Sequence, residues 1–163
     1  MSKRSVVLAM QLLGMALTGA SAVSAQMPNA YGAPIDLATA KSVAAAAAAE
    51  AKKTNLTMAI AIVDVGGDLV YFEKTDGTQT GSVALAIAKA NTSVKYKRPT
   101  EALRTALAAG GDGLRVLTYN DMAAVDGGVP IVVGGKIVGA IGASGGTFAQ
   151  DAQVANAGAA SSK

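Results

Sequence analysis

Apolar residues recur every three or four positions early in the chain, and this spacing predicts an amphipathic helix. Asp36 is placed to cap its start, and the pattern runs to about Lys53. One face of this helix carries small and apolar side chains: Leu37, Ala40, Val43, Ala47 and Ala51. Because alanine leaves little bulk between a helix and its neighbour, we expect the helix to lie close against a sheet.

Two later stretches combine β-branched residues with a central pair of glycines, which is typical of a β-hairpin. The first spans residues 57–72 around Gly66 and Gly67, and the second spans residues 129–143 around Gly134 and Gly135. Glycine supplies the positive φ angles that a two-residue turn needs. Since hairpins pair neighbouring strands antiparallel, the pattern predicts an α+β fold and not a doubly wound parallel sheet.

Further helical patterns lie between and after the hairpins. An apolar stripe predicts a helix from about Ser82 to Lys97, which Pro99 ends because the residue before a proline avoids the helical region. A second helix is expected after Thr100, and a last one after Thr147. The expected order is therefore helix, two strands, helices, two or three strands, helix.

The first 25 residues have the layout of a secretory signal. Lys3 and Arg4 form a positive start, an apolar run follows, and small residues lead up to Ala25. The apolar run is too short to span a bilayer, which takes about 20 residues. We expect cleavage after Ala25 and a periplasmic or extracellular protein with no stable membrane insertion.

The rest of the chain divides into two parts. Residues 26–35 hold two prolines, a glycine and an asparagine, and we expect a flexible lead-in there. Residues 36–160 are long enough to form a single domain with its own hydrophobic core.

The composition excludes several kinds of chemistry. The chain has no histidine and no cysteine, so it holds no Ser-His-Asp or Cys-His pair and no zinc site of the usual kind. Without Lys3 and Arg4, 12 basic residues stand against 11 acidic ones. We see no basic stripe with interleaved aromatic residues, and we expect no nucleic-acid partner.

The stretch GAIGASGGTFAQD at residues 139–151 raises the question of a phosphate site. A dinucleotide site needs G-x-G-x-x-G in a parallel unit, and a P-loop needs Gly-Lys before Ser or Thr, so neither nucleotide motif fits. The flat strand would admit a helix, another subunit or a planar ligand. The turn at Ser144, Gly145, Gly146 and Thr147 offers either a modest anion site or an ordinary helix cap.

Several short segments follow one another in a specific order: IVDVGG at 62–67, AIAKA at 86–90, GGVPI at 127–131, VGAIGASGG at 138–146, QD at 150–151 and AG at 157–158. Together they resemble the GlcG/HbpS-like family, which also supplies the C-terminal domain of PduO-type proteins. The resemblance covers residues 37–158. It implies an α+β domain with a five-stranded antiparallel sheet flanked by helices, in the order α-ββ-αα-βββ-α, and a homo-oligomer.

The resemblance also implies a function. Some secreted members are similar to haem sensors or haem-degrading proteins, and others stand beside glycolate or corrinoid metabolism. We therefore expect a secreted or periplasmic small-ligand-binding protein whose cofactor is haem or another tetrapyrrole. The alternative is a small enzyme or accessory oligomer acting on a carboxylate metabolite of glycolate type. Because histidine is absent, the remaining iron-ligand types besides lysine are Tyr71, Tyr96, Tyr119, Met58 and Met122.

The expected binding pocket comprises Lys74, Asp76, Lys89, Ser144, Gly145, Gly146 and Thr147. In one interpretation Lys89, with Lys74 or Arg98, holds a ligand carboxylate such as a haem propionate. In the other, Lys89 is a surface lysine whose stem lies along an apolar helix. In the alternative enzyme, Asp76 or Asp151 would act as a base beside the amides of the glycine turn. No metal ligand beyond the iron ligand types is expected.

Overall fold

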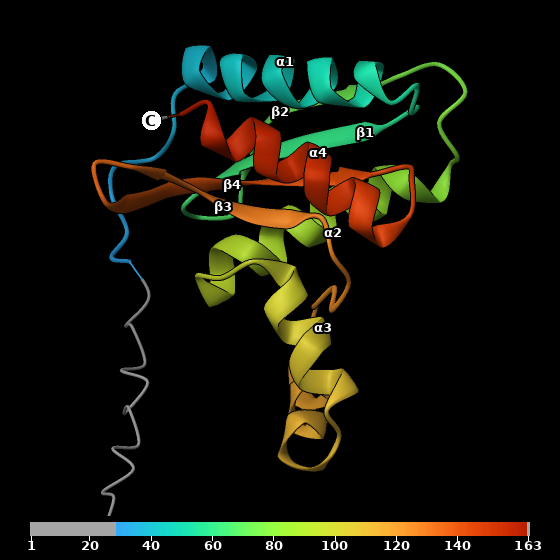
Figure 1. Cartoon of the computed structure of the whole chain (residues 1–163). Helices are drawn as coiled ribbons and strands as arrows, with labels where there is room; N and C mark the ends of the chain where they lie inside the picture. Colours follow the sequence, from blue (N-terminus) through green and yellow to red (C-terminus); the bar gives the residue numbers. More distant parts are fainter. Residues whose placement is uncertain (1–28, 163) are drawn as a thin grey trace, which may run out of the picture.

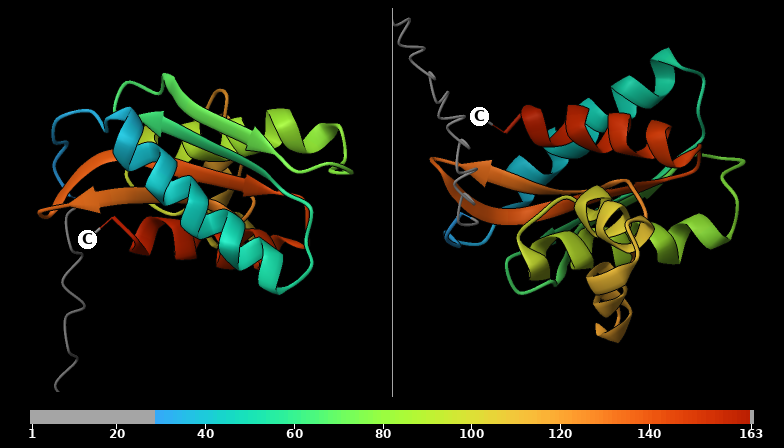
Figure 2. Two further views of the ribbon diagram at one scale, coloured as in Figure 1. Left: turned by 90° about the horizontal axis from the view of Figure 1, so that it is seen from above. Right: turned by 60° about the horizontal axis from the view of Figure 1, so that its bottom comes forward.

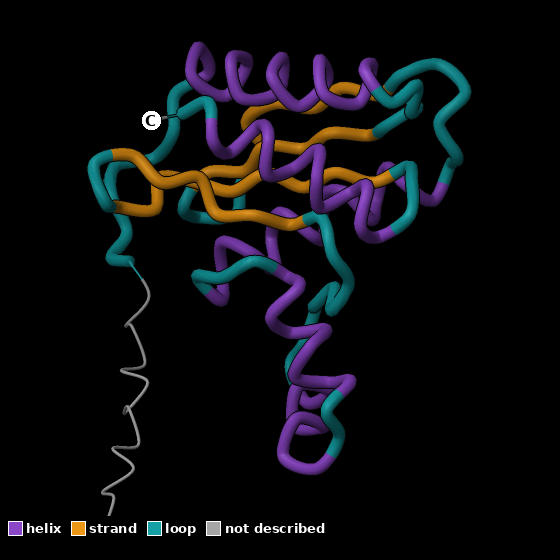
Figure 3. The backbone as a smooth tube through the Cα atoms, in the orientation of Figure 1, coloured by secondary structure: helices purple, strands orange, loops and turns teal. Residues whose placement is uncertain are grey.

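A computed structural model describes residues 29–162, and the expected signal peptide lies outside them. The chain forms three layers, with α1 and α4 on one face of a sheet and α2 on the other (Figures 1 and 3). A short arm made of α3 and the 3-10 segment η1 projects from the α2 side. The elements in chain order are α1 (Leu37–Lys53), β1 (Ala59–Asp64), β2 (Leu69–Lys74), α2 (Gly81–Tyr96), α3 (Thr100–Ala108), η1 (Gly111–Thr118), β3 (Gly128–Val133), β4 (Lys136–Ser144) and α4 (Phe148–Ala160).

The sheet is antiparallel throughout, with the strand order β2-β1-β4-β3. Both expected hairpins form, with positive φ angles at Gly67, Gly134 and Gly135. The α+β class is therefore confirmed.

The expectation of five strands was wrong, because the sheet in the described residues has four. The chain between η1 and β3 forms turns and loops in place of a strand. Within this segment Ala123 N donates to Thr92 Oγ1 at 2.8 Å, and at the start of β3 Gly128 N donates to Thr100 Oγ1 at 3.0 Å. The hydrogen bond of Ala123 satisfies a backbone donor that lies outside any strand.

The hydrophobic core lies mainly between the sheet and the pair α1 and α4, which run side by side (Figure 2). Asp36 caps α1 by accepting from Thr39 N at 2.7 Å, as expected. Most of the expected apolar face of α1 is buried, but Leu37 at its first position is 50% exposed. A smaller cluster under α2 contains Val63, Ala90 and Val94.

The residues just before α1 are bound to the start of β4, although we expected a flexible lead-in there. Ile137 exchanges backbone hydrogen bonds with Ala30 and Gly32 at 2.9 and 2.8 Å. The Tyr31 hydroxyl donates to Val94 O at 2.7 Å, which ties this segment to α2. Among the described residues, no helix is long and apolar enough to cross a membrane.

Candidate functional site

Two glycines allow α2 to lie against the backbone of the sheet. Gly128 and Gly142 are partners in the β3–β4 pairing. A Cβ atom at Gly142 would stand 2.0 Å from the Ala86 carbonyl oxygen, and one at Gly128 would stand 2.3 Å from the Lys89 carbonyl oxygen. We expected a helix, another subunit or a planar ligand against the flat face of this strand, and the helix α2 is the neighbour that lies there.

The same close approach places Lys89 in the interior. Its side chain is fully buried, and Nζ donates to Ala143 O at 2.9 Å and to Asp151 Oδ2 at 2.6 Å. Gly127 leaves room for the ammonium group, since a Cβ there would lie 3.0 Å from Nζ. Lys89 is thus not a surface lysine. Its ion pair with Asp151 links α2 on one face of the sheet to α4 on the other.

The carboxylate of Asp151 also closes the glycine turn. Its Oδ1 accepts from Gly145 N at 3.1 Å and from Gly146 N at 2.9 Å. Thr147 and Gln150 form a capping box, in which Thr147 N donates to Gln150 Oε1 at 2.9 Å. The amides that we expected to meet an external anion are therefore bound to side chains of α4.

Electrostatics at this pair are dominated by its removal from water. Burial lowers the pKa of Lys89, because a charged ammonium loses its hydration, and the hydrogen bond and charge of Asp151 oppose this shift. Asp126, which accepts from Arg104 Nε at 2.5 Å, adds a smaller opposing effect. Removing either partner of such a buried pair would leave the other charge without compensation in the interior, which is strongly destabilising.

The structure does not bring all expected site residues together. Lys74 pairs with Ala59 on β1, and Ala59 pairs with Ser144 on β4, so two strand spacings, about 10 Å, separate Lys74 from Ser144. Lys74 and Asp76 are exposed, whereas Ser144 is buried and its hydroxyl lies 3.2 Å from that of Ser82. Ligand binding by these residues stays a prediction.

An open cavity that the sequence reasoning did not anticipate lies on the opposite side of α2. It has a volume of about 720 Å³ and is lined by Gly66, Gly67, Ala84, Ile87, Ala88, Asn91, Lys95, Asp121 and Met122. The spacing of Ala84, Ala88, Asn91 and Lys95 puts them on one helical stripe, but nothing in the sequence joins this stripe to Met122 or to the turn at Gly66 and Gly67. The hydrogen bond from Ala123 N to Thr92 fixes the neighbouring Met122 beside α2.

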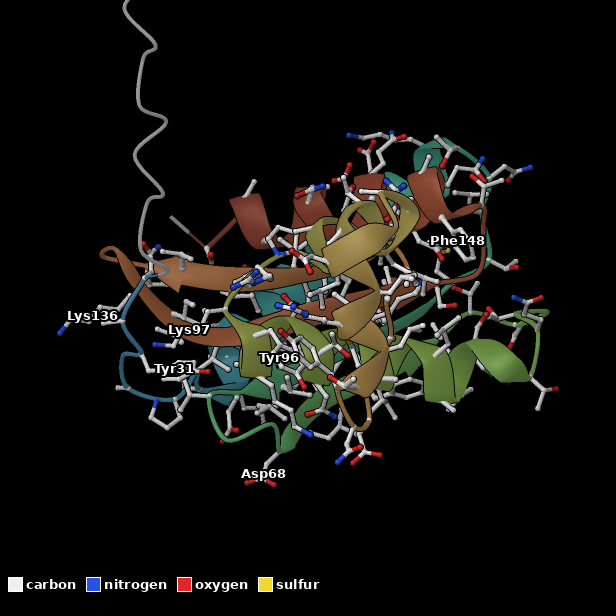
Figure 4. All side chains as sticks on the ribbon, turned by 90° about the horizontal axis from the view of Figure 1, so that it is seen from below. Tyr31, Asp68, Tyr96, Lys97, Lys136 and Phe148 are labelled. Carbon is white, nitrogen blue, oxygen red and sulfur yellow. The ribbon has the colours of Figure 1, made fainter. Side chains whose placement is uncertain are left out.

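The candidate iron ligands differ in their burial and in their position relative to the cavity. Met58 is fully buried, and the Tyr71 hydroxyl donates to Glu73 at 2.9 Å. Tyr96 and Tyr119 stack on each other with ring centroids 4.9 Å apart. Figure 4 shows Tyr96 on the α2 face, with Tyr31 and Lys97 toward one end of the molecule and Phe148 toward the other. Of these candidates, Met122 is the one that lines the cavity.

Comparison with known proteins identifies the family. A family model described as haem degrading protein HbpS-like matches residues 35–160. The chain therefore belongs to the HbpS-like family. It is also 37% identical over 105 residues to protein GlcG of Escherichia coli (strain K12), which covers 64% of this chain and 77% of GlcG.

Solved structures show the same fold. A double mutant of HbpS from Streptomyces reticuli superimposes with a TM-score of 0.72 at 25% identity, covering 97% of each chain. A structure named as a PduOC:heme complex superimposes with a TM-score of 0.71 at 24% identity, covering 78% of this chain and 94% of that one. At this identity the second likeness concerns the fold alone.

Proposed function

We propose that this protein binds haem or a related tetrapyrrole, and that the ligand lies in the cavity on the outer side of α2. The description of the family as haem degrading supports the ligand. The observation that carries the proposal is Met122 in the wall of an open cavity beside α2.

The residues of the cavity fit this ligand. A volume of about 720 Å³ lies within the range of small-molecule and cofactor sites, about 300–1,000 Å³. Ala84, Ile87 and Ala88 offer a low apolar wall that a flat ring can approach, and the Met122 thioether is a known type of haem ligand. When bound, haem would supply an iron centre for electron or oxygen chemistry. The residues that would hold it are Ala84, Ile87 and Ala88 against the ring and Met122 as the sulfur ligand.

The experiment compares haemin with iron-free protoporphyrin IX. Met122→Leu keeps an apolar side chain of similar size but removes the sulfur atom. We expect haemin binding to weaken about tenfold, the typical effect of losing about 1.4 kcal/mol, with a changed absorption spectrum, and iron-free binding to stay the same. Met58→Leu is the matched control, because Met58 is buried away from the cavity.

Two results count against this proposal. Absence of haemin binding by the wild type at about 10 µM, near the micromolar affinity expected of a working binder, would remove the ligand. An unchanged haemin spectrum in Met122→Leu would remove Met122 as the iron ligand. The alternative, a carboxylate-metabolite enzyme using the glycine turn, lacks support from the geometry, because Asp151 already binds the amides of Gly145 and Gly146.

We also propose that the protein is exported and forms a homo-oligomer. The layout of residues 1–25 supports export, and the family resemblance supports assembly. N-terminal sequencing of protein from the periplasm or medium should begin at Gln26, and a cytoplasmic chain starting at Met1 would contradict export. Light scattering at micromolar concentration should give at least a dimer, and a monomer would contradict assembly.

A further inference from the structure

The cavity on α2 changes character along its length. Ala84, Ala88, Asn91 and Lys95 line it in that order on one helical stripe, which spans about 16 Å at 1.5 Å per residue. The stripe is apolar near the start of α2 and polar near its end. A ligand with one apolar edge and one charged edge would therefore fit in a single direction.

Positive charge gathers at the polar end. Lys95, Lys97 and Arg98 follow closely at the end of α2, and within residues 29–162 none of them has a carboxylate oxygen within 4.0 Å. Lys95 lies in the last turn of α2, where a cation also complements the helix dipole, whereas Lys97 and Arg98 follow the end of the helix. Lys95 differs from its neighbours because it alone of the three lines the cavity.

The neighbouring cations are engaged elsewhere. Lys97 Nζ lies 4.1 Å from the centre of the Tyr31 ring, and Arg98 Nε donates to Tyr96 O at 3.0 Å. Asp121 is the one acidic residue in the cavity lining, and its negative charge opposes an anionic ligand in the cavity. Lys95 and Asp121 therefore act in opposite directions on any ligand carboxylate held there.

We infer that the cavity holds its tetrapyrrole with the carboxylate edge at Lys95 and the apolar edge along Ala84 and Ala88. This inference rests on the proposed function and specifies the ligand class: a tetrapyrrole with free carboxylates on one edge. Lys95 binds the carboxylate, and Asp121 limits the affinity for it.

The test uses iron-free protoporphyrin IX and its dimethyl ester, so that no iron ligand contributes. Lys95→Gln should weaken binding of the diacid about three- to fivefold, the effect of an exposed ion pair, and should leave the ester unchanged. The difference should shrink at about 0.5 M salt, because exposed charges are screened. Asp121→Asn should strengthen binding of the diacid and not of the ester.

Lys97→Gln is the matched control, since it removes a neighbouring cation that does not line the cavity. It should bind both porphyrins as the wild type does. Equal binding of the diacid by Lys95→Gln and the wild type would overturn the inference, and so would equal weakening of diacid and ester. If the wild type binds neither porphyrin nor haemin, the proposed function fails first and this inference fails with it. If the wild type binds haemin but has the same affinity for the diacid and the ester, only the inferred orientation of the ligand would be contradicted.

Discussion

The two sides of α2 differ in almost every physical respect. The inner side lies on the backbone of β3 and β4 and carries Lys89, whose charge is matched by Asp151 in the interior. The outer side is open, and its wall near the start of α2 consists of small apolar residues. Lys89, Asp151 and the amides of Gly145 and Gly146 thus bind each other, whereas the cavity on the outer side is open to solvent.

The difference follows from the cost of burying charge. A lysine that enters the interior must find an anion and further hydrogen-bond partners, because an unpaired buried charge is strongly destabilising. Asp151 meets this need and also satisfies two amides at the start of α4. A cavity open to water makes no such demand on its lining.

The largest effect is expected at the ion pair. Lys89→Met should lower the free energy of unfolding by about 3–5 kcal/mol, because it leaves the Asp151 carboxylate buried without its cation. Urea unfolding measures this change. Lys53→Met is the matched control: its pair with Glu50 is on the surface, with the lysine 72% exposed, and should contribute at most about 0.5 kcal/mol. A loss no larger than that of the control would contradict a buried pair.

The close packing of α2 predicts the next effect. Gly142→Ala should destabilise the fold by about 2–3 kcal/mol, since the new methyl group would meet the backbone of Ala86. Gly81→Ala, at the first position of α2, is the control. A Cβ there meets nothing within 4 Å, so alanine should be neutral or stabilise by up to about 1 kcal/mol. Equal stability of the two variants would show that α2 does not touch the strand.

The smallest effect is a pH dependence. Burial lowers the pKa of folded Lys89 below its ordinary value of 10.5, so in the window between the two values the unfolded chain binds more protons. The free energy of unfolding of the wild type, relative to Lys89→Met, should therefore rise as the pH increases through that window. Parallel urea titrations on both proteins measure it. A relative stability that falls as the pH increases would contradict the lowered pKa.

Local patterns in the sequence were enough for most of the fold. The Asp36 cap, the alanine face of α1 and the two-residue turn at Gly134 and Gly135 depend on neighbouring residues and formed as expected. In the first hairpin only Gly67 has the expected positive φ, and the turn is longer, from residue 65 to residue 68. The fifth strand, which the family resemblance implied, is absent from the described residues: the segment before β3 forms turns, and its Ala123 amide binds the side chain of Thr92. Such hydrogen bonds join residues far apart in the chain, and no local pattern records them.

The site was less predictable. The expected pocket grouped Lys89 with the glycine turn, and the structure joins the two through the carboxylate of Asp151 of the same chain. Lys74 and Asp76 were grouped with them although two strand spacings intervene between Lys74 and Ser144. The cavity was missed because alanines on a helix usually indicate packing, and its opposite wall comes from Met122 and a distant turn.

The central claim is that the ligand binds on the outer side of α2 and not at the Lys89 pair. Haemin titration of Ala88→Trp tests it most directly, because Ala88 lines the cavity and is adjacent to Lys89 in the chain. With exposed Ala45→Trp on α1 as control, the account predicts that Ala88→Trp loses haemin binding while its free energy of unfolding stays near that of the wild type. Haemin binding of wild-type strength by Ala88→Trp would contradict the account.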